Sequence, residues 1–545
     1  MKESLRETTW GLLRMRRQPA PPTSVACPTE SPNRAAVRVL EMATLVYVTL
    51  PFVLFALGWL KLWIGLPAAV LAAAGAWRCA LARRGEAENG SATKPARQRE
   101  LRVLIALFLL VVILVAYSGA GGYSHQYVDY QRHNAFLRDL IERPWPTSFQ
   151  HVPPDGKPGF LAFYIANSLP AAAVGKLFGW AAANFASFLW TVAGFYLAVC
   201  WFLRVIGRVS FRFGLLFVFF GGLDIIGRVT LVGWPANPAR PFDNWVLQFV
   251  ARSSAADKME GIFWFFPSNL SFVYYAPQHV IGPWLCVLVL MYDAIRNKTC
   301  RRAVFLWSLV LLWSAFSFVG LLPFLGLALF VTRGRGLFSF ENTLAAGAVL
   351  FMTLLYLKSN NHAYPHGFLW QYQDVTRTWP VLLFFYALEF GIYALLCPGP
   401  RRSNEFQFHR AWQWLAIACL LAAPWYVLGR WNDLTTKVGI PALVVFQVGL
   451  ANALLGAKTG MDRIRAYALI ALLVIGSLAS LSNVYRGINH GFRFRPPDLQ
   501  KVRHTNRIIP RKGPVSGNMP GSTVDQLFSD GDAFFWKFLA RSSGT

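Results

Sequence analysis

Charged residues are scarce in this chain of 545 residues: they make up 14% of it, whereas hydrophobic residues make up 55%. A soluble protein carries about 25% charged residues. Apolar runs long enough to cross a hydrocarbon layer of about 30 Å recur along most of the length. No soluble core could absorb so much apolar surface, so the sequence predicts an all-α, polytopic integral membrane protein.

Acidic residues are scarcer than basic ones: 26 Asp and Glu stand against 53 Lys and Arg, which gives a formal net charge of +27. The excess Lys and Arg collect in short loops, as in loops that stay on the cytoplasmic side of a membrane. No soluble domain combines a basic patch with interleaved aromatic residues, so we expect no nucleic-acid partner.

Several catalytic and metal-binding motifs are absent. The seven cysteines show neither CxxC nor zinc-finger spacing. The sequence has no GxxxxGK(S/T), HExxH or GxSxG motif. These absences argue against a nucleotide-driven motor, a common zinc protease and an α/β-hydrolase.

The apolar segments and their basic connections predict a topology of about 13 crossings, because Lys and Arg favour the cytoplasmic side. The candidate segments are residues 39–60, 62–82, 102–118, 159–178, 182–203, 213–233, 277–295, 303–318, 319–332, 342–358, 379–396, 411–428, 438–456 and 464–482. Parity requires that one segment does not span, and we expect 159–178 to be an interfacial or re-entrant helix. Residues 303–332 are expected to form two short spans broken near Gly320 and Pro323.

Three regions follow from this topology. Residues 1–37 are polar, Pro-rich and basic, which predicts a disordered cytoplasmic tail. Residues 38–482 form the transmembrane domain. Residues 483–545 are expected to be an external tail with a short amphipathic helix that docks back onto the protein. The apolar side of that helix is expected to consist of Phe534, Phe535, Phe538 and Leu539.

The predicted external face holds most of the reactive side chains, including eight of the nine histidines. Nothing breaks a helix between Tyr127 and Glu142, and one apolar stripe indicates that this helix lies in the interface plane. Asp129 and His133 are four residues apart and therefore share a helix face. A carboxylate beside an imidazole can act as a general base, a metal ligand or an ion pair. The Arg138–Glu142 and Asp139–Arg143 spacings indicate local pairs on a solvated polar face.

Other external segments carry candidate binding residues. Lys157 precedes an apolar segment, where an ammonium can reach a lipid phosphate or simply snorkel to water. Gln278 and His279 form a Pro-Gln-His turn at the mouth of a span, and such a histidine is either functional or merely hydrogen-bonded.

Asn432, Asp433 and Lys437 occupy a short external loop ahead of a Pro-started helix. Asp433 either lines the site or caps the start of that helix. Lys437 is another cation that can reach a phosphate.

Four blocks resemble sequences of GT-C-type glycosyltransferases, a superfamily of polytopic enzymes that includes the lipid A aminoarabinose transferase and the protein mannosyltransferases. They are "DYQRHNAFLRDLIERPWP", "YYAPQHVIGPWL", "WNDLTTKVGIPAL" and "DAFFWKFLA". More narrowly, the blocks resemble a group of uncharacterised bacterial membrane proteins. Many GT-C members have a second acid in the first external loop, where this chain has Tyr130.

The resemblance implies a fold with interfacial helices in the first large external loop, and roles for particular residues. The first-loop acid of the family acts as catalytic base or metal partner, a role that falls on Asp129, with His133 and Asn134 beside it. Basic residues hold the donor phosphate, which points to Lys157, Arg132 and Lys437. The remaining residues expected to line the cavity are Gln278, His279, Asn432 and Asp433. A divalent metal is the only candidate cofactor.

The expected function is transfer of a sugar from a polyprenyl-phosphate carrier to a lipid, glycan or protein acceptor. The reaction would take place on the external face of the cytoplasmic (inner) membrane, with the N-terminus inside and the C-terminus outside. Two alternatives stay open. A lipid or glycan transporter or flippase predicts polar residues buried through the full membrane depth. A membrane acyltransferase would use His133 or His279 as its base.

Overall fold

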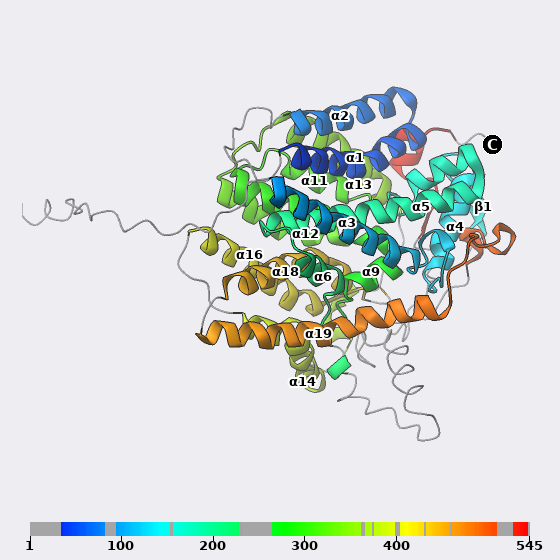
Figure 1. The fold of residues 1–545 in the computed structure, drawn as a ribbon. Coiled ribbons are helices and arrows are strands. Elements are labelled where there is room, and N and C mark those ends of the chain that lie inside the picture. Colours follow the sequence, from blue (N-terminus) through cyan, green and yellow to red (C-terminus); the bar gives the residue numbers. More distant parts are fainter. Residues whose placement is uncertain are drawn as a thin grey trace, which may run out of the picture.

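The computed structural model is a bundle of helices (Figure 1) with two small sheets. It describes residues 34–81, 94–152, 156–223, 225–227, 230, 264–360, 366–372, 375–397, 404–429, 432–457, 460–508 and 527–542. The expected disordered tail, residues 1–37, lies almost entirely outside the described residues.

The helices of the first half alternate between long apolar segments and short connecting turns. They are α1 (Arg34–Trp59), α2 (Leu62–Leu81), α3 (Lys94–Ala116), η2 (Ala120–Gly122), α4 (Tyr130–Glu142), α5 (Leu169–Val205), α6 (Phe211–Phe219), α9 (Asn269–Tyr275), η4 (Pro277–His279), α10 (Ile281–Tyr292) and η5 (Asp293–Asn297).

The second half continues the bundle and ends in short turns. Its helices are α11 (Ala303–Val310), α12 (Ala315–Thr332), η6 (Glu341–Ala345), α13 (Ala346–Lys358), η7 (Leu369–Gln371), α14 (Val375–Tyr386), η8 (Ala387–Gly391), α15 (Ile392–Leu396), α16 (Asn404–Ala422), η9 (Ala423–Trp425), α17 (Asp433–Val438), α18 (Ile440–Gly456), α19 (Gly460–Asn489), η10 (Leu499–Lys501), η11 (Thr505–Arg507) and η13 (Phe535–Leu539).

Seven of the described helical segments are long and apolar enough to cross a membrane. They are Ala36–Trp59, Leu62–Leu81, Leu169–Val205, Pro277–Asn297, Ala315–Thr332, Trp379–Leu396 and Gly460–Asn489. The prediction of a polytopic helical membrane protein agrees with this finding. The finer count of about 13 crossings stays a prediction.

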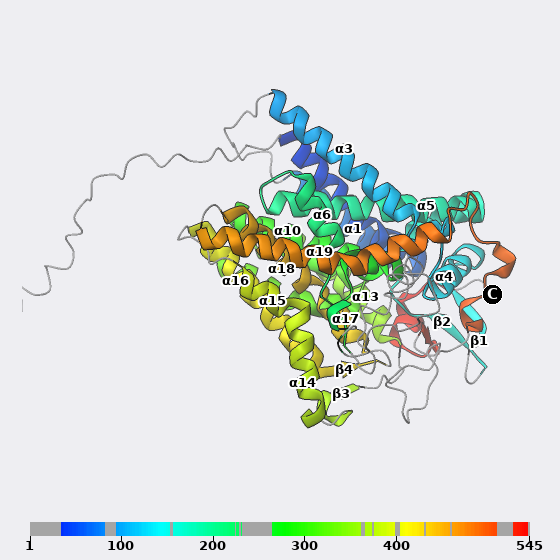
Figure 2. The same ribbon diagram turned by 60° about the horizontal axis from the view of Figure 1, so that its bottom comes forward.

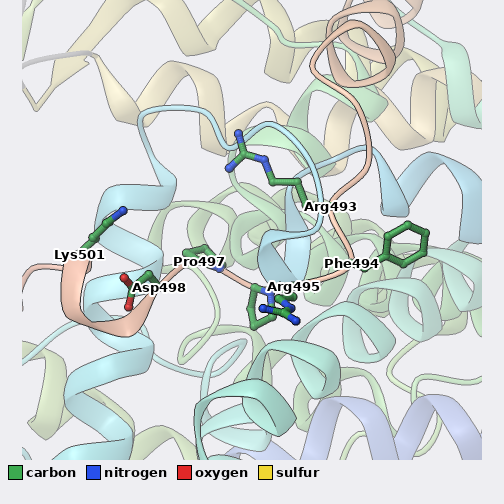
Figure 3. A pocket seen from close by; sticks show the side chains of 7 residues that line it. Arg493, Phe494, Arg495, Pro497, Asp498 and Lys501 are labelled. Atoms are coloured by element: carbon green, nitrogen blue, oxygen red, sulfur yellow. The ribbon is translucent and has the colours of Figure 1, made fainter.

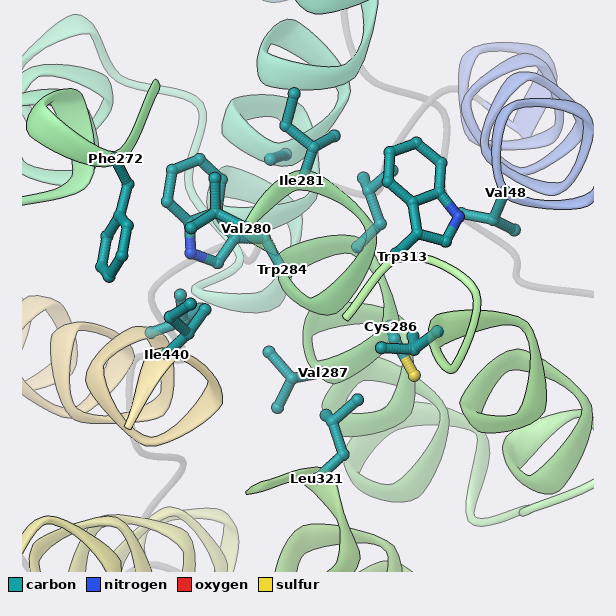
Figure 4. Packing of buried hydrophobic residues seen from close by; sticks show 14 of the residues in the cluster. Val48, Phe272, Val280, Ile281, Trp284, Cys286, Val287, Trp313, Leu321 and Ile440 are labelled. Atoms are coloured by element: carbon teal, nitrogen blue, oxygen red, sulfur yellow. The ribbon is translucent and has the colours of Figure 1, made fainter. Parts of the chain in front are cut away.

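The centre of the bundle is α10, which is apolar on every face and is buried along its whole length. A helix that is hydrophobic all round belongs in an interior. Figure 4 shows Trp284 and Val287 of α10 packed among side chains of neighbouring helices, including Trp313, Leu321 and Ile440. The bundle is therefore organised around this helix.

Segment 159–178 is not one helix. It begins inside strand β2 (Lys157–Leu161), and a helical arm starts only at Leu169. That arm ends at Gly179, whose φ of 82° breaks the helix before the second arm continues to Val205. Ten helical residues rise only about 15 Å, half of a hydrocarbon layer. The arm alone is thus too short to cross this layer, and its place at the interface stays a prediction. The strand before it was not expected.

The break in residues 303–332 lies earlier than predicted. Helix α11 ends at Val310 and α12 begins at Ala315, while Gly320 and Pro323 both lie inside α12. The Ser314 side chain accepts a hydrogen bond from the backbone N–H of Ser317, which caps the new helix start. Gly320 is needed instead for close packing, because a Cβ there would lie 2.2 Å from the carbonyl oxygen of Val438.

One end of the bundle, here called the tail end, gathers α4, the β1–β2 hairpin and the C-terminal segments (Figure 2). Strand β1 (Ser148–Val152) pairs antiparallel with β2, and β5 (Phe528–Ser529) adds to the other edge of β2. A second, two-stranded sheet joins β3 (His366–Phe368) to β4 (Tyr426–Leu428). The sequence predicted no strand at these positions.

The opposite end of the bundle is held by buried ion pairs. Arg302 places its Nε 2.6 Å from an oxygen of Asp293 and its Nη2 3.0 Å from Glu41 Oε1. Arg78 lies 3.4 Å from the buried carboxylate of Glu341. Which end faces the cytoplasm stays a prediction from the distribution of Lys and Arg.

The C-terminal segment docks onto the tail end, but two details of the prediction were wrong. Helix α19 continues to Asn489, seven residues beyond the expected boundary at 482, because nothing in "SNVYRGIN" stops a helix before Gly491. Of the four residues expected on the apolar side of the last helix, only two are buried, Phe535 and Leu539. Phe534 and Phe538 are more than half exposed. Trp536 completes the buried side.

Candidate functional site

Helix α4 sets the position of the first candidate residues. It begins at Tyr130, three residues later than predicted, because residues 127–129 form turns in which the N–H groups of Tyr130 and Gln131 bond to Tyr127 and Val128. It ends at Glu142, and Arg143 is already extended, as expected of the residue before a proline. Its apolar stripe is buried against the protein.

Asp129 and His133 share one turn at the start of α4, as the sequence predicted. The His133 N–H donates to the Asp129 carbonyl at 3.2 Å. The Asp129 side chain is solvent-exposed and caps no backbone N–H. Its carboxylate is therefore open to approach by a substrate.

The His133 ring is oriented by the backbone of α9. Its Nε2 lies 3.1 Å from the carbonyl oxygen of Tyr275. Because a carbonyl can only accept, Nε2 carries the proton, and Nδ1 holds the lone pair of the neutral ring. Burial lowers the pKa of His133, although the Asp129 carboxylate and the hydrogen bond to Tyr275 act in the opposite direction.

Asn134 is held by a reciprocal amide pair. Its Nδ2 donates to Gln126 Oε1 at 2.7 Å, and Gln126 Nε2 donates back to Asn134 Oδ1 at 3.4 Å. The same Gln126 donates to the carbonyl of Gly119. Asn134 is thereby fixed against the loop that precedes α4, and both its amide nitrogen and its amide oxygen already have a hydrogen-bond partner.

The Pro-Gln-His turn forms the 3-10 helix η4, between α9 and α10. His279 is buried, and its Nδ1 lies 3.1 Å from the hydroxyl of Ser314. Gln278 is half-buried, and its Oε1 has no hydrogen-bond partner among the described residues. A buried amide oxygen without a partner is costly, so Gln278 offers an acceptor to a ligand or to water.

Helix α17 carries the third group of candidates. Asp433 is its first residue and pairs with Lys437 at 2.7 Å, four residues on, instead of capping the helix. Asn432 precedes the helix in the left-handed conformation, with φ of 49°, and is fully buried. Its Nδ2 has no partner among the described residues.

These three elements meet at the tail end. Arg132, His133 and Lys437 all lie within electrostatic range of His279. The Ser317 hydroxyl joins two of the elements directly, because it lies 3.2 Å from the carbonyl of His279 and 2.9 Å from that of Lys437. Segments separated by more than 300 positions in the sequence thus form one polar site.

Lys157 is the exception among the predicted residues. It lies exposed at the start of β2, in the β1–β2 hairpin, opposite Val152. Lys437 instead lies next to His279, because the Ser317 hydroxyl contacts the carbonyl oxygens of both residues. Lys437 is therefore the cation that belongs to the site, and Lys157 stands outside it.

A small cavity of about 30 Å³ opens beside His133 and Asn134. Its other lining residues include Tyr130 and Asn167, and Oδ1 of Asn167 is buried without a hydrogen-bond partner among the described residues. Such a space holds about one water molecule with several polar neighbours. The cavity gives His133 a polar environment behind the exposed face of α4.

Sequence reasoning missed several residues at this end. Asp139, assigned to a solvated face, is fully buried. It contacts Arg143 as predicted, but it also lies 2.6 Å from Nδ1 of His504. Asn483 accepts hydrogen bonds from the hydroxyls of Tyr127 and Tyr275 at 2.8 and 3.1 Å. No local pattern marks these long-range contacts.

The described residues form no ready-made cluster of metal-binding side chains. Among them, no group of three or more His, Cys, Asp or Glu side chains is arranged to hold a metal ion. Asp129 and His133 alone are fewer ligands than a catalytic metal site normally has. No step of the mechanism below therefore passes through a metal.

Comparison with protein-family models, with curated proteins and with solved structures gives no match for this chain.

Proposed function

We propose that the chain is a membrane glycosyltransferase of the GT-C type. It transfers a sugar from a polyprenyl-phosphate donor to a lipid, glycan or protein hydroxyl. The observation that supports this most is the meeting of one exposed carboxylate, Asp129, with the cations Arg132 and Lys437 around His133 and His279. A carboxylate and phosphate-binding cations are the two kinds of group that the reaction requires.

The chemistry assigns a role to each side chain. The acceptor oxygen attacks the anomeric carbon, and the bond from that carbon to the phosphate oxygen breaks. The proton of the acceptor hydroxyl passes to Asp129, which acts as the general base. The negative charge on the departing polyprenyl phosphate is stabilised by Arg132 and Lys437. Because the phosphate is already a leaving group, no nucleotide is needed.

The membrane setting fits a lipid-linked donor. The long prenol stays in the bilayer, and its phosphate lies at the level of the headgroups. The site occupies one end of a bundle whose helices include seven of membrane-spanning length. We assign that end to the external face of the cytoplasmic membrane, with the N-terminus inside and the C-terminus outside, from the distribution of Lys and Arg.

The test is transfer of radiolabelled sugar from polyprenyl-phosphate donors in membranes that contain the chain. We expect transfer by the wild type, and a loss of about 100-fold or more in Asp129→Asn, since general-base catalysis contributes about 10²–10⁴-fold. Asp462→Asn, at the start of α19, is the matched control and should keep full activity. Full activity in Asp129→Asn, or no transfer by the wild type from any such donor, would refute the proposal.

A lipid or glycan flippase is the second candidate, because polar side chains are also buried away from the site. Asn269 and Gln447 exchange amide hydrogen bonds of 2.8 and 3.2 Å between α9 and α18. These amides satisfy each other, as in helix packing within a membrane, and so favour a structural role. Movement of labelled lipid across vesicles without sugar transfer would favour the flippase.

A further inference from the structure

A basic groove follows the end of α19 and lies outside the site described above. It is an open cavity of about 590 Å³ in the segment that leads from α19 to η10. Its lining residues are Arg493, Phe494, Arg495, Pro496, Pro497, Asp498 and Lys501. Figure 3 shows the two arginines, Phe494 and Lys501 carried by one curved stretch of chain.

The backbone of the groove is anchored to neighbouring elements. The Arg493 N–H donates to the carbonyl of Tyr123, and the Trp180 indole N–H donates to the carbonyl of Pro497 at 2.8 Å. Pro497 packs so closely on Gly122 that a Cβ there would lie 2.1 Å from the proline ring. The cations of the groove are thus presented from a fixed backbone.

The positive charge of the groove is not neutralised within the described part of the chain. Arg493, Arg495 and Lys501 make no ion pair with any described residue, and Asp498 uses a carboxylate oxygen to accept the N–H of Gln500. Three cations around one carboxylate leave a net positive field. The groove therefore favours an anionic ligand.

Positive charge also surrounds the approach to the groove. His125 stacks on His490 with ring centroids 4.1 Å apart. Burial lowers the pKa of His125, and the charges of His490, Arg486 and Arg493 lower it further. Arg486 and Arg493 thus add positive charge near the groove.

Apolar side chains place the groove at the membrane surface. Phe494 is 91% exposed and packs edge-on against Phe492, which is itself 40% exposed. Helix α19, which leads into the groove, is long and apolar enough to cross a membrane, and only 28% of its most apolar 18-residue stretch is buried within the protein. Leu481 and Ile488, toward the end of this helix, are exposed. An aromatic residue between two arginines at the end of a lipid-facing helix is typical of the headgroup region.

We propose that this groove binds the phosphate of an anionic membrane lipid, with Arg493, Arg495 and Lys501 around the phosphate and Phe494 among the upper acyl carbons. The occupant is a bilayer phospholipid and not a soluble anion, because Phe494 would otherwise expose its ring to water. The proposal does not depend on the glycosyltransferase function.

The experiment uses the full chain in phosphatidylcholine nanodiscs that contain a small fraction of phosphatidylglycerol with a photoreactive headgroup. We expect cross-linking to the peptide that covers residues 490–501. Unlabelled phosphatidylglycerol should compete for this labelling, whereas additional phosphatidylcholine should not. The variant Arg493→Gln/Arg495→Gln/Lys501→Gln should lose labelling of this peptide by about tenfold or more, since each cation near an anionic surface contributes roughly fivefold in affinity.

A matched control removes three exposed cations from the opposite end: Arg333→Gln/Arg335→Gln/Arg465→Gln. It should label residues 490–501 as the wild type does. The thermal unfolding midpoints of both triple variants are compared with that of the wild type, so that loss of labelling by an unfolded variant is recognised. A second variant, Phe494→Ala, should weaken labelling while keeping all three cations.

Three outcomes would overturn the proposal. The first is equal labelling of residues 490–501 by a photoreactive phosphatidylcholine. The second is unchanged labelling in the folded triple variant. The third is displacement of the lipid by inorganic phosphate at the same concentration, which would make the groove a site for soluble anions.

Discussion

Asp139 and His504 are 365 positions apart in the sequence, yet the Asp139 carboxylate lies 2.6 Å from Nδ1 of His504. The same carboxylate accepts the backbone N–H of Thr505 at 2.7 Å and the Nε–H of Arg143 at 3.0 Å. Asp139 is fully buried. The C-terminal segment is thereby fixed to α4, the helix that carries His133 and follows directly after Asp129.

Replacement of Asp139 by Asn should therefore destabilise the protein. The variant loses a charged acceptor for two side chains, and each hydrogen bond to a charged group contributes about 1.5–3 kcal/mol. We expect a loss of about 3 kcal/mol, measured as a lower midpoint of thermal unfolding in detergent. Limited proteolysis should also cleave residues 490–508 faster, because the segment is released from α4.

Glu142→Gln is the control for that variant. Glu142 pairs with Arg138 on the same helix at 3.0 Å, but its side chain is 34% exposed. A partly exposed pair of this kind contributes less than about 1 kcal/mol. Glu142 also lies 4.0 Å from Nε2 of His504. Equal unfolding midpoints for the two variants would therefore show that the buried contacts of Asp139 add no more stability than the partly exposed ones of Glu142.

The stability of the protein should depend on pH through His133. Burial lowers the pKa of His133 in the folded state, so the unfolded chain binds a proton that the folded one does not. Stability is then present above the ordinary histidine pKa of about 6.5 and is lost as the pH falls below it. We expect the unfolding midpoint to fall between about pH 7 and pH 5, and His133→Gln to reduce that fall. In the control variant His151→Gln, which changes an exposed histidine, the unfolding midpoint should vary with pH as in the wild type. The same pH dependence in the wild type and both variants would contradict the assignment to His133.

Lys437 and Lys157 should differ in their effect on activity. Lys437 lies within range of His279 and is held by Asp433, whereas Lys157 is exposed in the β1–β2 hairpin. If the proposed transfer is correct, Lys437→Gln should lower kcat/KM for the lipid-linked donor by about tenfold or more, since a charge-assisted hydrogen bond contributes about 1.5–3 kcal/mol. Lys157→Gln should change it by less than about threefold. Steady-state kinetics in membranes measure both; the reverse order would exclude Lys437 from the phosphate site.

The sequence predicted those features of the site that follow from short spacing. Asp129 and His133 share a turn because they are four residues apart, and the Pro-Gln-His turn follows from a proline at the start of a helix. Asp433, by contrast, was expected in a loop ahead of the Pro-started helix, whereas it begins the separate helix α17. Its pairing with Lys437 has the same four-residue spacing and could have been predicted in the same way.

The features that the sequence did not predict depend on distant contacts. Asp139 has the spacing of a surface pair with Arg143, and its burial arises only because residues 504 and 505 close over it. Strand β2 pairs with β1 on one side and with β5 on the other, and β5 lies more than 360 positions after β2 in the sequence. A pattern of apolar residues within a stretch of about 20 residues predicts local secondary structure, but not which distant segments come into contact.

Close packing between α1 and α2 should make Gly65 indispensable. A Cβ at Gly65 would lie 2.1 Å from the carbonyl oxygen of Ala56, which belongs to the backbone and cannot rotate away. The two helices must separate in Gly65→Ala, and overpacking of this kind costs about 1–3 kcal/mol. Gly347→Ala in α13 is the matched control, because nothing lies within 4 Å of its Cβ position and alanine favours the helix. We expect the thermal unfolding midpoint to fall in the first variant and to stay or rise slightly in the second. Equal midpoints would mean that α1 and α2 are less closely packed than this geometry requires.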